Sequence, residues 1–199
     1  MLARILQAAG RGPTIVFCRT KRTAQKTSDD LAERGFRAAT IHGDLGQSAR
    51  EKALNDFKAG KSDVLIATDV AARGIDIDGI THVINYQCPE DEKTYVHRIG
   101  RTARAGAHGI AVTFVDWDEL ARWKMIDTAL ALGLPEPLET YSSSEHLYEM
   151  LNIPAGSTGR IVKAKPAAVA PKAAKPAIAK QESAPRVKRE RTRTKRISS

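Results

Sequence analysis

Short apolar runs alternate with longer amphipathic stretches along residues 1–152 of the chain. Five runs have the length and β-branched content of buried strands, at residues 14–18, 37–41, 63–67, 81–85 and 109–115. Between them, apolar residues recur at helical spacing, which predicts helices over residues 20–34, 47–58, 91–101 and 116–132. Such alternation is typical of a mostly parallel sheet that is covered by helices on both faces. We therefore predict an α/β fold.

Helix-ending and helix-starting residues support these bounds. Gly35, Gly60 and Gly133 follow three of the helical stretches and are expected to stop them. Asp91 precedes another and is expected to cap its amino end.

A change in composition near residue 153 predicts the end of the folded domain. Residues 153–199 consist mainly of Lys, Arg, Ala and Pro, with prolines at 166, 171, 176 and 185 that would break a long helix. With no aromatic residue, this segment buries too little apolar surface to fold. We predict a domain over residues 1–152 and a disordered basic tail over 153–199.

The charge of the chain is concentrated in this tail. The whole sequence carries +9, whereas residues 157–199 carry +11 and residues 1–156 carry −2. The cluster at residues 186–196 could contact nucleic-acid phosphates without sequence specificity. A tail that only improves solubility is the alternative.

Other features narrow the class of protein. No apolar run approaches the roughly 20 residues needed to span a bilayer, and residues 1–10 do not resemble a signal peptide. We therefore expect a cytoplasmic protein without a membrane partner. Cys18 and Cys88 stand alone in apolar contexts, so we expect buried thiols rather than a metal site.

Polar residues follow four successive predicted strands. They include Arg19–Arg22 after the first strand, His42–Asp44 with Gln47 and Arg50 after the second, and residues 68–76 after the third. Residues 97–104, with one histidine and three arginines, follow the fourth. Ligands of parallel sheets bind beyond the carboxyl ends of the strands, so these residues are expected to form one site.

The pair Arg101 and Arg104 is the strongest chemical signal. A helical turn would direct both guanidinium groups to the same side, and arginine forks match phosphate oxygens. This predicts a polyphosphate ligand. Taken alone, the pair could equally be the exposed basic face of a helix.

Four segments together resemble the C-terminal RecA-like lobe of DEAD-box RNA helicases. They occur in the family's order at residues 15–21, 42–50, 67–76 and 95–104. The resemblance implies a RecA-like three-layer sandwich. One departure is Ala103, where the family usually has glycine; because alanine fits a helix better, we expect no loss of function.

The resemblance implies a role for each matching residue. Arg101 and Arg104 correspond to arginine fingers for the γ-phosphate of ATP, His97 and Arg98 to residues that couple ATP to the contact between lobes, and Asp76 to an acid beside the ribose. The RNA backbone would be held by Thr20, Arg22, Gly43, Thr68, Asp69, Arg73 and Gly74, with Gln47 and Arg50 bracing these loops.

The sequence lacks the other half of such an enzyme. It contains no Gly-x-x-x-x-Gly-Lys-Ser/Thr phosphate loop and no Asp-Glu-Ala-Asp. The nearest sequence, residues 55–62, has Asn55 at the first glycine and lies between a helix and a strand, the reverse of a phosphate loop. ATP and Mg²⁺ would thus depend on an N-terminal RecA-like lobe that carries the Mg²⁺ ligands, and this chain alone should hydrolyse ATP negligibly.

Three alternatives remain open at this stage. The chain could be an RNA-binding module without ATPase activity, a lobe of a DNA helicase, or a truncated gene product without a function of its own. Five large apolar residues beyond the motifs are expected to pack in the core: Trp117, Leu120, Trp123, Met125 and Ile126. The alternative is that they form a docking face for RNA or a protein.

Overall fold

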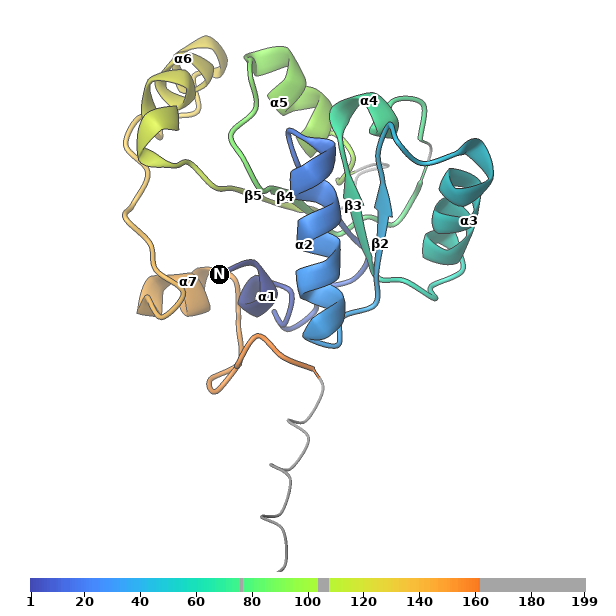
Figure 1. Ribbon diagram of the computed structural model, residues 1–199. Coiled ribbons are helices and arrows are strands. Elements are labelled where there is room, and N and C mark those ends of the chain that lie inside the picture. Colours follow the sequence, from blue (N-terminus) through green and yellow to red (C-terminus); the bar gives the residue numbers. More distant parts are fainter. Residues whose placement is uncertain (76, 104–107, 162–199) are drawn as a thin grey trace, which may run out of the picture. The chain divides into compact units, whose positions relative to one another are not determined.

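The computed structural model of the protein describes residues 1–75, 77–103 and 108–161 (Figure 1). Its centre is a sheet of five parallel strands in the order β2-β3-β1-β4-β5. The strands are β1 (Thr14–Phe17), β2 (Ala38–Ile41), β3 (Val64–Ala67), β4 (His82–Asn85) and β5 (Ile110–Thr113). Each falls within a predicted run, and the predicted α/β fold is confirmed.

Helices lie before, between and after the strands. They are α1 (Leu2–Ile5), α2 (Lys21–Glu33), α3 (Gln47–Lys58), α4 (Asp69–Ala72), α5 (Glu92–Ile99), α6 (Leu120–Leu130), which a 3₁₀ turn η2 (Trp117–Glu119) precedes, and α7 (Glu145–Met150). The short helices α1, α4 and α7 were not expected from the sequence, because one turn of helix has no measurable periodicity. Conversely, α5 ends at Ile99, two residues before the predicted end.

Alternate residues of the central strands enter two separate cores. Val16, Val64, Ile66 and Ile84 pack with apolar side chains of α1, α2 and α7. Ile15, Leu65 and Val83 face the other way, toward α3 and α4. The side chains of β1, β3 and β4 are buried on both faces, which explains why the sequence shows continuous apolar runs there.

A third, smaller core joins α5 to α6. Tyr95 and Trp123 meet edge to face with ring centroids 5.8 Å apart, and Ile126 is 1% exposed. The expectation of core packing holds for Trp123 and Ile126 but is wrong for Trp117 and Met125, which are 79% and 65% exposed. Apolar residues at mixed helical spacings do not specify which of them face the core.

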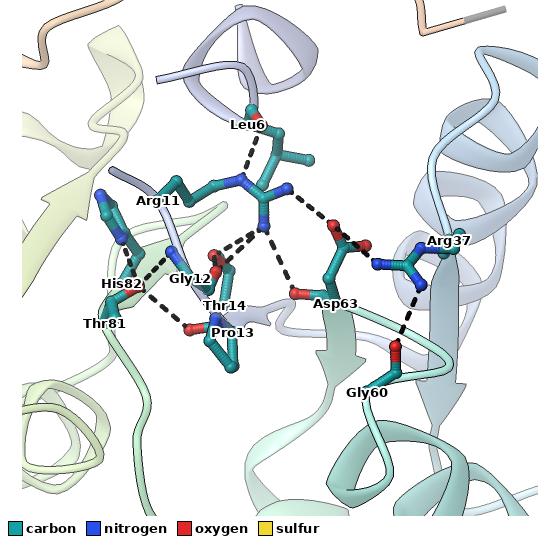
Figure 2. A network of polar contacts seen from close by, with 10 residues as sticks. All are labelled: Leu6, Arg11, Gly12, Pro13, Thr14, Arg37, Gly60, Asp63, Thr81 and His82. Carbon is teal, nitrogen blue, oxygen red and sulfur yellow. Dashed lines mark hydrogen bonds and ion pairs between the residues drawn. The ribbon is translucent and has the colours of Figure 1, made fainter. Parts of the chain in front are cut away.

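A polar network closes the amino ends of the strands (Figure 2). The Arg11 guanidinium donates to the Leu6 carbonyl at 2.6 Å and pairs with the Asp63 carboxylate at 2.9 Å, and the Gly12 N–H donates to the Thr81 hydroxyl at 2.9 Å. This network ties the starts of β1, β3 and β4 together. It lies at the opposite end of the sheet from the predicted site.

The folded part continues past the predicted boundary at residue 152. The Ile153 side chain is buried, the Gly159 N–H donates to the Gln7 side chain at 2.7 Å, and the Ile161 N–H donates to the Arg34 carbonyl at 2.8 Å. The rest of the predicted tail, 162–199, lies outside the described residues.

Candidate nucleotide and RNA site at the carboxyl edge of the sheet

The register of the sheet brings the predicted loops to a single edge. Phe17 pairs with Ala67 and Asn85, and Ile41 pairs with Ala67, so β1 to β4 end level with one another. The residues after each strand therefore emerge side by side. This edge contains all seven residues predicted to hold the RNA backbone: Thr20, Arg22, Gly43, Thr68, Asp69, Arg73 and Gly74.

The loop after β1 is shaped by a helix cap. The Thr20 hydroxyl accepts a hydrogen bond from the Thr23 N–H at 3.1 Å and so begins α2. Thr20 and Arg22 are both exposed. Their polar groups are thus accessible, and the amino end of the 13-residue helix α2 favours an anion nearby.

A buried histidine, His42, supports the loop after β2. His42 Nδ1 accepts from the Asp44 N–H at 3.3 Å, and Nε2 lies 3.2 Å from the Gln25 Oε1 atom. Asp44 also pairs with Lys21 at 2.8 Å, and this hydrogen bond holds the pKa of Asp44 below its ordinary value. These contacts leave the backbone of Gly43 at the surface, where a Cβ would meet nothing within 4 Å. The fold itself does not require glycine at this position, whereas close approach of a ligand would.

The loop after β3 turns sharply at Gly74. Thr68 begins α4, Arg73 is exposed, and Gly74 has φ +74°, a left-handed conformation that favours glycine. Arg50 reaches this region from α3, because its guanidinium donates to the Ala71 carbonyl at 3.3 Å. Gln47 instead donates to Glu51 on its own helix at 2.7 Å. A bracing role for both residues stays a prediction.

Arg98 is the most deeply buried charged residue at this edge, with 2% of its surface exposed. Its Nε and Nη2 atoms donate to the two carboxylate oxygens of Asp69, each at 2.7 Å, and Nη1 donates to Asn85 and to the Gln87 carbonyl, each at 3.2 Å. Its Cζ atom lies 5.3 Å from the centroid of the Phe17 ring. All three guanidinium nitrogens thus serve internal partners. Arg98 therefore joins α5 to α4, and its role in coupling ATP to the contact between lobes stays a prediction.

His97 and Arg101 lie on the accessible side of the same segment. Asp91 caps α5 as predicted, since its carboxylate accepts from the Thr94 N–H at 2.7 Å, and this bond lowers the pKa of Asp91. Beyond the helix, the Arg101 guanidinium donates to the Ile75 carbonyl at 3.0 Å and to the His97 carbonyl at 3.3 Å. These two bonds fix its direction while the side chain stays partly exposed.

Ala103 corrects one expectation from the sequence. It follows the end of α5 and has φ +55°, so it is left-handed and not helical. The argument that alanine suits a helix better than glycine is therefore wrong here, because glycine is the residue that adopts this conformation without steric cost. Asp76 and Arg104, the other predicted nucleotide-binding residues, lie outside the described residues.

Three contacts at this edge were not anticipated from the sequence. Phe17 and Asn85 meet Arg98, and the buried Glu119 pairs with Arg19. None has a local sequence signal, because the partners are at least 13 residues apart in the chain. Cys18 and Cys88 are fully buried as expected, and burial raises the pKa of each thiol to about 11.

Two features of the described residues concern metal ions and membranes. No group of three or more His, Cys, Asp or Glu side chains there is placed to hold a metal ion. Nor does any helix in that part of the chain have the length and apolar character to cross a bilayer.

Comparison with known proteins gives a consistent result. Residues 1–106 match the family described as helicase conserved C-terminal domain. The ATP-dependent RNA helicase CshA of Listeria monocytogenes is 51% identical over 127 residues, which cover 64% of this chain and 24% of that protein. The chain thus spans about a quarter of the length of the curated relatives it matches.

Solved structures agree with this match. The DEAD-box protein SrmB of E. coli, bound to regulator of ribonuclease activity A, has 32% identity and a TM-score of 0.63, covering 72% of this chain and 88% of that one. S. cerevisiae Dbp5 bound to RNA and ADP BeF3 has 31% identity and a TM-score of 0.65, covering 76% of this chain and 40% of that one.

Proposed function

Because the chain belongs to the helicase conserved C-terminal domain family and is a C-terminal lobe of the DEAD-box type, we propose that it provides half of the RNA-binding surface and an arginine finger for ATP hydrolysis. The observation that carries this proposal is the level ending of β1 to β4, which gathers exposed Thr20, Gly43 and Arg73 at one edge. Arg101 reaches the loop after β3 through its bond to the Ile75 carbonyl. Hydroxyl groups, exposed backbone and arginine are the groups that hold a sugar-phosphate chain without reading its bases.

The residues fit one side of a nucleotide site. Arg101 has a guanidinium that two carbonyl groups direct, and it would stabilise charge that develops on the γ-phosphate. Mg²⁺, when bound, would neutralise phosphate charge. Its ligands would come from the N-terminal lobe, which would carry the phosphate loop and the Asp-Glu-Ala-Asp motif that this sequence lacks.

In the intact enzyme, ATP would bring the two lobes together on an RNA strand. Each lobe would contribute part of the backbone contacts, and hydrolysis would release them. Dbp5 has been solved with both RNA and a nucleotide analogue, which supports RNA as the partner here. The proposal includes a cytoplasmic location, which cell fractionation would test, and RNA contact through the basic tail.

The test is reconstitution with a separate N-terminal DEAD-box lobe. The 199-residue chain alone should hydrolyse ATP negligibly, and the two lobes together should show hydrolysis that RNA stimulates. Arg101→Ala should abolish turnover in that mixture and leave RNA binding within a few-fold; an unchanged turnover number would exclude Arg101 as the finger. Deleting 162–199, which spares the bonds of Gly159 and Ile161 to the fold, should weaken RNA binding and flatten its dependence on log salt concentration.

A stand-alone RNA-binding module is the second candidate, because exposed Thr20, Gly43 and Arg73 could hold a sugar-phosphate chain without ATP. The reconstitution experiment distinguishes the helicase lobe from the stand-alone module. A module would bind RNA with full affinity on its own and would give no ATP turnover with any added lobe. Comparison of RNA with DNA strands of equal length would identify a DNA helicase lobe.

A further inference from the structure

A buried acid outside the family match holds several parts of the site together. Glu119 ends η2, before α6, and is 5% exposed, whereas the match ends at residue 106. Its Oε2 atom accepts from the N–H groups of Cys88 at 3.2 Å and Asp116 at 3.3 Å. Its Oε1 atom accepts from Arg19 and, at 3.4 Å, from Arg122. A carboxylate so enclosed is stable only while its partners stay in place.

Arg19 turns away from the accessible edge toward this acid. Although its neighbours Thr20 and Arg22 are exposed, its guanidinium donates to the Cys88 carbonyl at 3.2 Å and to Glu119, and its backbone N–H donates to the Gln87 side chain at 3.0 Å. Arg19 is therefore bound to the loop after β4 from both its backbone and its side chain.

The same loop is bound to the buried arginine of α5. The Gln87 carbonyl accepts from Arg98, which in turn pairs with Asp69 through both carboxylate oxygens. Residues 87–88 consequently lie between two arginines. One leads to Thr20 and the other to α4 and α5, so a continuous series of hydrogen bonds connects α5 with the loop after β1.

We propose that Arg19 and Glu119 form a positioning pair that holds the loop after β1 against the loop after β4. Through this contact, the pair couples RNA binding at Thr20 to the nucleotide-facing segment that carries His97 and Arg101. This inference rests on the proposed function of the edge. The pair touches neither RNA nor ATP. It makes binding of one ligand favour the geometry that binds the other, which appears in solution as a coupling factor between the two affinities.

The coupling factor is measured in the chain combined with an N-terminal lobe. It is the ratio by which saturating RNA lowers the ATP concentration for half-maximal hydrolysis. Arg19→Ala and Glu119→Ala should each reduce this factor about tenfold, and the double variant should reduce it no further, because either change releases the same contact. If Glu119→Ala fails to fold, Glu119→Gln removes the charge and keeps an acceptor.

Arg122→Ala is the matched control. It removes an arginine from the same carboxylate, with the same change in net charge, but Arg122 does not reach the loop at 87–88 through the bonds described above. It should leave the coupling factor within about twofold. An equal reduction of the coupling factor in Arg122→Ala would overturn the positioning pair. So would a double variant of Arg19 and Glu119 whose reduction is the product of the two single reductions.

Amide hydrogen exchange tests the pair without any ATPase assay. In the 199-residue chain, Glu119→Ala should speed exchange of the Arg19 N–H, which donates to Gln87 and has no direct bond to Glu119. Unchanged exchange at Arg19 would refute the pair even if the helicase assay succeeds. If wild-type lobes show no RNA-stimulated hydrolysis, the proposed function fails, and the exchange result still decides the pair.

Discussion

Replacement of Ala103 by glycine should stabilise the protein. Ala103 is exposed and has φ +55°, so the substitution removes a Cβ that crowds the backbone and loses no core contact. A left-handed alanine costs about 1–2 kcal/mol, and glycine gives back about 0.4–1 kcal/mol through the greater freedom of the unfolded chain. The expected net gain in the free energy of unfolding is about 0.5–1 kcal/mol.

Urea denaturation followed by circular dichroism measures this gain. With a slope of about 2 kcal/mol per molar urea, the midpoint should rise by about 0.3–0.5 M while the slope stays constant. If residue 103 were helical, the same change would lower stability by about 1 kcal/mol. The two conformations therefore predict opposite signs, and a lower midpoint would refute the left-handed assignment.

Two alanines of α6 calibrate the measurement in the same chain. Ala129 is an exposed residue inside the helix, so Ala129→Gly should destabilise the protein by about 1 kcal/mol. Ala131 is the exposed cap of that helix with φ +51°, so Ala131→Gly should raise the midpoint as Ala103→Gly does. If Ala131→Gly and Ala129→Gly shifted the urea midpoint in the same direction, the steric cost of a left-handed alanine would be refuted.

Three further predictions concern binding, pH and thiol reactivity. Gly43→Ala should change the urea midpoint by little, because a Cβ at this position would meet no atom within 4 Å. The same substitution should weaken RNA binding about tenfold if the backbone of Gly43 approaches a phosphate. Equal RNA affinity of the variant and the wild type in filter binding would exclude Gly43 from the site. Burial and Arg11 lower the pKa of His82 in the folded protein below its ordinary 6.5. As the pH falls, His82 is therefore protonated in the unfolded chain before it is protonated in the folded protein, and the free energy of unfolding should decrease as the pH drops through about 6.5. Midpoints at pH 7.5 and 5.5 should differ less in His82→Gln than in the wild type, and an identical difference would exclude His82 as the source. Cys18 and Cys88, with pKa values raised to about 11, should resist a thiol reagent at pH 8 until the protein unfolds, and rapid labelling of the native protein would contradict their burial.

Local patterns in the sequence were sufficient to predict the main elements. The strand at 64–67 and the helix Gln47–Lys58 were predicted from apolar spacing and a terminal glycine, since both signals act within a few residues. The predicted cap at Asp91 is confirmed for the same reason. Because parallel strands end at a common edge, order alone also predicted that the loops after β1 to β4 would meet.

The tertiary structure decided which charged side chains face that common edge. His97 and Arg98 are neighbours in the sequence, yet one is exposed and the other is bound to Asp69, 29 residues away. Arg19 and Glu119 are 100 residues apart, and no local pattern relates them. The direction of a side chain near a helix end depends on which distant partner can satisfy its charge once water is excluded, and that partner is determined only when the layers of the fold come together.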